Sequence, residues 1–157
     1  MKIKEKTMEK LELFEAASND LLETMQGFKD NLSAQLSLLD SDNWQYDKGS
    51  IKVCKADESG FKKRSRVGIS YNLKVSLTNE DAEQIWLLFK DWFNANRLSL
   101  VERNSNNEDL GRYAFSASSP LGDQVDCSLY LLNEWNIPQI SLSGYLTARY
   151  RACDIDK

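Results

Sequence analysis

A strict two-residue alternation from Val67 to Leu77 constrains the fold more than any other feature of this sequence. Apolar residues occupy every odd position of the segment, and the even positions hold Gly68, Ser70, Asn72, Lys74 and Ser76. Successive side chains of a β-strand point to opposite faces, so the pattern predicts a strand with one buried face and one solvent-exposed face. Such strands are typical of an antiparallel sheet that is covered on one side.

The next segment, residues 78–94, predicts a helix that covers this sheet. Thr78 or Asn79 is suited to cap its first turn, where Glu80 and Asp81 place negative charge at the positive end of the helix dipole. Its apolar residues share one side: Ala82, Ile85, Trp86, Phe89, Trp92 and Phe93. We interpret this aromatic cluster as core, with a ligand-binding box as the alternative. Leu87 points elsewhere, and we expect it to be exposed.

A long helix is expected from about Lys6 to Leu39, before the sheet. Its apolar residues recur at three- and four-residue spacings, at Leu11, Phe14, Leu21, Met25, Phe28, Leu32 and Leu39. We interpret it as a helix that lies on the sheet, and a coiled-coil seam is the alternative. Residues 1–7 are expected to be a mobile leader, and residues 8–157 a single domain.

The remaining segments are predicted to be strands. Ile51 and Val53 indicate a short strand after a turn at Asp47-Lys48-Gly49. Four more strands are expected at residues 97–103, 111–118, 124–132 and 139–150, separated by polar turns. This order predicts an α+β two-layer sandwich, in which one long N-terminal helix and one central amphipathic helix pack on an antiparallel sheet.

The charge balance limits the partners of the chain. With 20 Lys and Arg against 24 Asp and Glu, the net charge is −4, which argues against a nucleic-acid partner. No apolar run approaches the ~20 residues of a transmembrane segment. The basic run Lys62, Lys63, Arg64 and Arg66 falls in a predicted polar loop. Two roles are open for it: a solvated loop, or a contact with phosphate or anionic lipid.

Histidine is absent from the sequence, and this limits the chemistry that the chain can perform. Neither a Ser–His–Asp or Cys–His nucleophile nor a His-containing zinc site can form. Phosphate-binding glycine motifs are missing as well. We therefore expect no catalytic residues, no cofactor and no metal site, and we expect that the protein is not an enzyme. A carboxylate pair is the one catalytic alternative.

Three cysteines, at positions 54, 127 and 153, lack the CxxC spacing of metal sites. Cys127 alternates with Val125 and Leu129, which predicts a buried thiol. Cys54 follows the short strand and Cys153 follows the last strand, and we predict that these two lie within bonding distance. In a reducing cytosol they would be free thiols, and in an exported protein they would form the natural disulfide.

Trp135 falls in the predicted turn at residues 133–138, where a large aromatic side chain is less easily explained as core. Two roles are open for it: a contact residue at the surface, or a plug at the end of the sheet. The candidate surface contacts are therefore Trp135, Leu87, Lys62, Lys63 and Arg64.

The order of these features resembles the LppA-like lipoproteins of actinobacteria over residues 25–153. The matching features are Trp44 and Cys54, the aromatic helix from Asp81 to Phe93, Gly122-Asp123, and a last strand with Thr147 that ends near Cys153. The resemblance implies a domain held outside the membrane by a lipid anchor on a cysteine upstream of this sequence. It also implies an unassigned biochemical role.

Two functions are consistent with these observations. The first is a non-enzymatic, envelope-associated, lipoprotein-like domain that binds a protein partner or a small ligand. The second is a small acidic cytoplasmic interaction protein, such as an immunity protein that binds and blocks a partner protein. A native export signal followed by a cysteine would favour the first function, and free thiols at positions 54 and 153 would favour the second.

Overall fold

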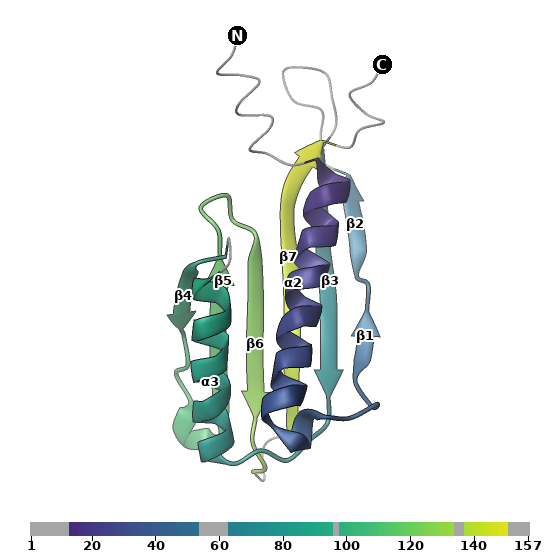
Figure 1. Cartoon of the computed structure of the whole chain (residues 1–157). Coiled ribbons are helices and arrows are strands. Elements are labelled where there is room, and N and C mark those ends of the chain that lie inside the picture. Colours follow the sequence, from purple (N-terminus) through teal and green to yellow (C-terminus); the bar gives the residue numbers. More distant parts are fainter. Residues whose placement is uncertain (1–12, 54–62, 96–97, 134–136, 151–157) are drawn as a thin grey trace.

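A long strand, β3 (Lys63–Leu73), contains most of the predicted alternating segment. In the computed structural model, residues 13–53, 63–95, 98–133 and 137–150 are described, and within them seven strands form one antiparallel sheet (Figure 1). Ile69 and Leu73 are buried on one face of β3, as the alternation predicts. Residues 74–78 leave the sheet to reach the next helix, so the strand is shorter than the sequence pattern, although Leu77 is buried as well.

The sheet order is β1-β3-β7-β6-β5-β4, with β2 also paired to β3. The strands are β1 (Gln45–Asp47), β2 (Ser50–Val53), β4 (Leu100–Arg103), β5 (Arg112–Ser118), β6 (Gln124–Tyr130) and β7 (Gln139–Tyr150). A short 3₁₀ helix, η2 (Glu108–Leu110), connects β4 to β5. The four strands predicted after residue 96 are thus confirmed, within a few residues at their ends.

At the predicted turn, Asp47-Lys48-Gly49, the Gly49 backbone N–H donates to the Asp47 carboxylate over 2.8 Å, which forms a local Asx turn without a reversal of the chain. Both β1 and β2 run antiparallel to β3, and Asp47 pairs with Ser70 while Ser50 pairs with Val67. The register therefore continues across the gap, and β1 and β2 form one interrupted edge. Gly49 has φ +69°, and a side chain there would overlap the carbonyl oxygen of Val67. Glycine therefore permits a local irregularity in this edge of the sheet.

The basic run is not a loop in the part of the chain that the structure describes. Lys63, Arg64 and Arg66 belong to β3, and Lys62 lies outside the described residues. Arg66 points to the helix layer, where its Nη1 donates to the Ser18 hydroxyl over 2.7 Å and its Nε donates to the Lys48 carbonyl over 3.0 Å. The prediction of a polar loop failed because charged residues can occupy a strand whose end is open to solvent.

Helix α2 (Phe14–Gln35) is the predicted N-terminal helix, followed by the 3₁₀ helix η1 (Ser37–Leu39). The leader predicted at residues 1–7 lies outside the described residues. One side of α2 is buried, at Phe14, Ala17, Ser18, Leu21, Met25, Phe28 and Leu32. Met25 packs directly on β7, because a Cβ at Gly144 would lie 2.5 Å from the Met25 sulfur. The helix therefore lies on the sheet, as expected.

Helix α3 (Asn79–Asn94) begins with a capping box. The Thr78 side chain accepts from the Asp81 backbone N–H over 3.1 Å, and the Asp81 carboxylate accepts from the Thr78 N–H over 2.9 Å. Phe89 is fully buried, and its ring centroid lies 5.5 Å from that of Phe28 on α2. Trp86 and Trp92 are partly buried and pack against the same core. The aromatic cluster is therefore the inside of the domain.

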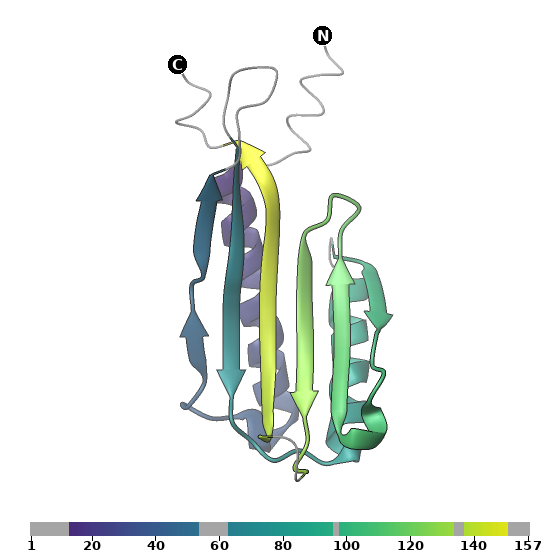
Figure 2. The same cartoon turned by 180° about the vertical axis from the view of Figure 1, so that it is seen from behind.

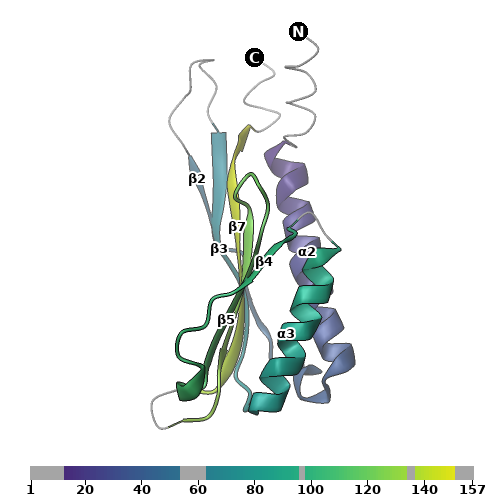
Figure 3. The same cartoon turned by 90° about the vertical axis from the view of Figure 1, so that its left-hand side faces the viewer.

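The two helices cover the same face of the sheet, and this arrangement is the predicted α+β two-layer sandwich. Figure 3 shows α2 and α3 side by side on one side of the strands. Figure 2 shows the strands from behind, with both helices on the far side. The second face of the sheet therefore has no helix over it in the described part of the chain. None of the described helices is long and apolar enough to span a membrane.

Candidate functional site

The predicted contact residues are described only in part. Leu87 is exposed on α3, at 55% of its full accessible area, as predicted. Trp135 and Lys62 lie outside the described residues, and the backbone of Lys63 and Arg64 belongs to β3. A contact role for these residues therefore stays a prediction.

Only one of the three cysteines lies among the described residues. Cys127 is a free thiol with no exposed area, which confirms the predicted burial. Burial raises the pKa of this thiol far above its usual range, and the nearby Asp126 charge adds to the effect. A thiol in this state is not a nucleophile near neutral pH. Cys54 and Cys153 lie outside the described residues, so their pairing stays a prediction.

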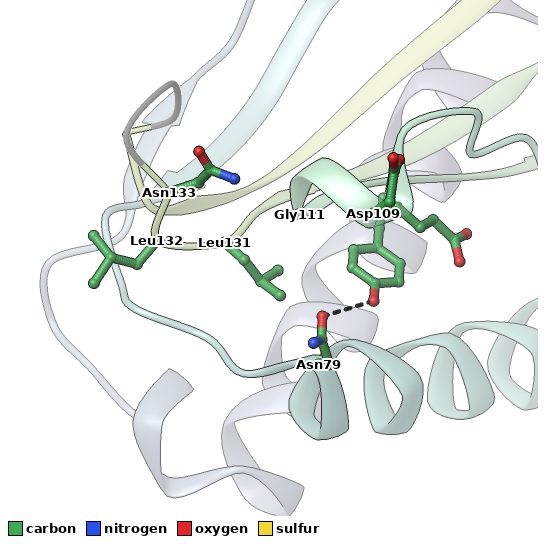
Figure 4. A pocket seen from close by; sticks show the side chains of 8 residues that line it. Asn79, Asp109, Gly111, Leu131, Leu132 and Asn133 are labelled. Carbon is green, nitrogen blue, oxygen red and sulfur yellow. Dashed lines mark hydrogen bonds between the residues drawn. The ribbon is translucent and has the colours of Figure 1, made fainter.

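A pocket of about 420 Å³ lies at the end of the molecule where α3 begins (Figure 4). Its lining comes from the first residue of α3, from η2 and β5, and from the chain after β6, and includes Asn79, Asp109, Tyr113, Leu131, Leu132 and Asn133. The Tyr113 hydroxyl donates to the Asn79 side-chain oxygen over 3.0 Å. The Asn133 amide donates to the Leu110 carbonyl over 3.3 Å. Several polar groups of this pocket are thus engaged with one another.

Beside the pocket, Arg103 of β4 joins three elements. Its guanidinium donates twice to Glu83 of α3, over 2.6 and 2.9 Å, and twice to Glu108 of η2, over 2.6 and 2.7 Å. Hydrogen bonds from Arg103 lower the pKa of both carboxyl groups, against a small opposing effect of burial. The guanidinium carbon also lies 5.9 Å from the ring centre of Trp86 and 5.5 Å from that of Tyr113. These contacts hold α3 against the edge of the sheet, which is a structural role.

The uncovered side of the sheet, which we call the open face, carries small polar side chains. Along β6, buried Val125, Cys127 and Leu129 point to the helices, so the residues between them point away. The register carries this division across the neighbouring strands. By this register the open face includes Gln45, Asp47, Ser70, Asn72, Leu100, Glu102, Arg112, Ala114, Ser116, Ser118, Gln124, Asp126, Ser128, Tyr130, Gln139, Ser141, Ser143, Tyr145, Thr147 and Arg149.

One cross-strand line of the open face contains three carboxylates. Residue pairs in register give a continuous line that we call the central row: Glu102, Ser116, Asp126, Ser143, Ser70 and Asp47. Asp126 is at its middle, on β6, and is half-buried. Burial raises the pKa of Asp126, and a hydrogen bond from Gln124 opposes the increase only in part.

Asp123, three residues earlier in the same hairpin, has a very different environment. The Arg149 guanidinium binds it with two hydrogen bonds, over 2.8 and 2.6 Å, and Thr147 donates through its backbone N–H and its hydroxyl. Burial alone would raise the pKa of Asp123, but the hydrogen bonds from Arg149 and Thr147 outweigh it and lower the pKa. Asp123 is thus a structural residue that ties the β5–β6 turn to β7.

The sequence does not single out Asp126 as a candidate site residue. The alternation in residues 124–132 does place Asp126 on the polar side of its strand. The sequence pattern of a single strand does not say whether a second layer covers that side. The sequence therefore does not show that Asp126 lies on an uncovered face, and this follows only from the position of both helices on the opposite face.

No protein-family model and no curated protein matches this chain. Among solved structures, the chain is similar to one described as "the putative lipoprotein LppA from Mycobacterium tuberculosis", with a TM-score of 0.64 and 13% sequence identity. The alignment covers 96% of this chain and 86% of that chain. At this identity the similarity concerns the fold, and it agrees with the fold-level resemblance found in the sequence.

Proposed function

We propose that this protein is a non-enzymatic binding domain that docks a partner protein on the open face of its sheet. The observation that supports the proposal is the half-buried Asp126 at the centre of a polar sheet face over which no described helix lies. A carboxylate partly removed from water costs stability unless a partner compensates it. A second protein on the open face would supply that compensation.

The size of the open face is suited to a protein partner. Six strands lie side by side across the sheet, and the five spacings of about 4.8 Å between them give a width of roughly 24 Å. Strands β5 and β6 have seven residues each, which gives a length of about 24 Å along the strands. The flat projection is then roughly 570 Å², a large part of the ~800 Å² that each partner commonly buries in a stable complex.

The pocket at the start of α3 is the alternative site, and it favours a small ligand. Its Tyr113 hydroxyl and Glu108 carboxylate are already bound by Asn79 and Arg103. Asp126, in contrast, accepts one hydrogen bond from Gln124 and forms no ion pair with a described residue. The open face therefore retains more binding capacity, and we propose it ahead of the pocket.

We further propose that the domain works outside the cytoplasm, in the cell envelope. The fold similarity to a protein described as a lipoprotein is one support. The second is that β2 and β7, which lead to Cys54 and Cys153, end at the same end of the sheet. Val53 pairs with Arg64, and Arg64 pairs with Arg149, so that one strand separates the two ends. Two strand spacings are about 10 Å, a gap that one to three further residues can close.

Site-specific photo-crosslinking tests the docking surface. A photoreactive residue replaces Ser143 on the open face, or Leu87 on α3 as the matched control, and the protein is expressed in the cells of its source organism. We expect a discrete crosslinked protein, identified by mass spectrometry, from position 143 and not from position 87. A partner captured from position 87 alone, or from neither position, would contradict the proposed surface.

The oxidation state of the cysteines tests the location. The protein is purified from its source organism, and free thiols are alkylated at lysis under unfolding conditions, so that the buried Cys127 also reacts. We expect one alkyl group, on Cys127, and a disulfide between Cys54 and Cys153. Peptide mapping with and without reductant measures this directly. Three alkylated thiols would instead support the cytoplasmic interaction protein.

A further inference from the structure

We propose that Asp126 is the anchor at which the open face binds a guanidinium group, the side chain of an arginine on the partner protein. This inference rests on the function proposed above. The register fixes the place of the anchor: Asp126 pairs with Ser116 on β5 and with Ser143 on β7. Its neighbours Val125 and Cys127 are fully buried toward the helices, so the carboxylate emerges on the open face.

The Asp126 carboxylate retains acceptor capacity. The Gln124 amide donates to its Oδ1 over 2.7 Å, and the structure gives it no ion pair with a described residue. An ionised carboxylate can accept about four hydrogen bonds. Its second oxygen, Oδ2, is therefore available to a donor that approaches from outside the sheet.

The charges on and around the open face favour a cation. Glu102 lies in the central row two strands from Asp126, roughly 10 Å away, and is exposed. Arg149, the buried cation on this face, is committed to Asp123 through two hydrogen bonds. Arg112 on β5 and Asp47 at the far end of the central row each lie roughly 14 Å from Asp126, so their opposite charges offset each other there. A cationic side chain of a partner would thus meet the negative charges of Asp126 and Glu102.

Guanidinium fits this site better than ammonium. Directly paired residues have Cβ atoms about 5 Å apart, so Ser116 and Ser143 flank the carboxylate. The Ser116 hydroxyl is buried and already accepts from the Asn104 amide over 2.8 Å, which leaves the Ser143 hydroxyl for a partner. The surface is flat, and its acceptors are spread along one row. A planar guanidinium offers five donors in a fixed fork and is more weakly hydrated than an ammonium group. It can therefore bind the carboxylate and a serine oxygen at once.

The cost of Asp126 to the free protein supports a binding role. Burial raises the pKa of its carboxyl group, so the ionised form is destabilised in the folded chain. Asp123, in the same hairpin, shows that this fold can compensate an aspartate internally with Arg149. A carboxylate left without such compensation is typical of a site that completes its contacts on binding.

An NMR titration with small probes tests the anchor without the partner. The ¹⁵N-labelled protein is titrated with Nα-acetyl-arginine amide, and with Nα-acetyl-citrulline amide as the neutral isostere. We expect saturable shifts of the amides of Ser116, Asp126 and Ser143 with the arginine probe and none with the citrulline probe. Asp126→Asn should weaken the arginine probe about tenfold, and Asp126→Glu should restore part of the affinity. Asp91→Asn, at an exposed position of α3 in the helix layer, is the matched control and should change little.

Each outcome decides a separate part of the inference. Unchanged affinity in Asp126→Asn would overturn the anchor, and equal losses in Asp126→Asn and Asp91→Asn would indicate diffuse attraction and overturn it too. Equal affinity for Nα-acetyl-lysine amide would overturn the choice of guanidinium. None of these results would remove a crosslinked partner at position 143, so failure of the anchor is distinguishable from failure of the docking surface.

Discussion

The two faces of this sheet are built from the same strands, and only one of them holds the fold together. On the covered face, large apolar side chains such as Phe115, Leu129 and Ile140 are fully buried under the two helices. On the open face, the residues between them are mostly polar, with Asp126 at the centre. Burial of apolar area dominates folding free energy, so the covered face carries most of the stability. The open face is then free to hold groups that cost stability and serve recognition.

The largest expected effect is on the covered face. Phe89→Ala removes a fully buried ring that contacts Phe28 and Phe93, and it should lower the free energy of unfolding by roughly 3–5 kcal/mol. Urea denaturation monitored by tryptophan fluorescence measures this change. Leu87→Ala, on the exposed side of the same helix, is the control and should change stability by less than about 0.5 kcal/mol. An unchanged midpoint for Phe89→Ala would mean that the aromatic cluster is not core.

Asp123→Asn should give the next largest effect, and it tests whether the open face is free of structural charges. The substitution leaves Arg149, 7% exposed, without its charged partner, so we expect a loss of roughly 3 kcal/mol. The lowered pKa of Asp123 adds a pH dependence: its contribution is complete above about pH 4, the pKa of an unfolded aspartate, and is lost as the pH falls below that value. The difference in the free energy of unfolding between wild type and Asp123→Asn should therefore be smaller at pH 3 than at pH 7, as measured by chemical denaturation.

Asp126→Asn should have a small effect of opposite sign. Because the pKa of Asp126 is raised, its ionised form destabilises the folded chain, and this penalty appears as the pH rises through the window between the unfolded and the folded pKa. The amide variant should be more stable than wild type at pH 7 by no more than about 1 kcal/mol. It should show no such gain at pH 3, where wild type is protonated. A loss of stability at pH 7 would assign Asp126 a structural role like that of Asp123.

The smallest expected effect is that of Ser143→Ala on the open face. Ser143 lies opposite Asp126 and Ser70 and packs under no described helix, so its removal should alter the free energy of unfolding by less than about 0.5 kcal/mol. Differential scanning calorimetry is sensitive enough for this comparison. A decrease above 1 kcal/mol would show that the hydroxyl row contributes to folding, and the contrast between the two faces would be weaker than we infer.

Much of the fold follows from local patterns in the sequence. In residues 67–73, 79–94 and 111–150, the apolar positions repeat either every two residues or every three to four residues. Each of these repeats predicts one type of element, a strand or a helix. The sequence placed the cap of α3 at Thr78 or Asn79, and the structure has a capping box at Thr78 and Asp81. Glycine is common both in chain reversals and in irregular strand edges, so the sequence does not distinguish the two. Gly49 permits an irregular edge opposite Val67.

The candidate site was harder to predict because it depends on tertiary packing. The sequence shows that Asp126 lies on the polar side of its strand, and it shows the same of Ser116 and Ser143. Only the packing of α2 and α3 on one face makes these side chains neighbours on an uncovered surface (Figure 3). The local pattern also could not distinguish Asp123 from Asp126, because the ion pair of Asp123 depends on Arg149, 26 residues away in the sequence.

The interrupted edge at Lys48-Gly49 has a consequence for how this protein behaves in concentrated solution. An exposed strand edge is a template for the strands of other molecules, and the edge here carries exposed Tyr46 and Ile51, which would favour such growth. The interruption divides that edge into segments of three and four residues, and the opposite edge, β4, has four. Each segment offers too few free N–H and C=O groups to hold another chain for long. The fold thus resists polymerisation into fibrils at both edges.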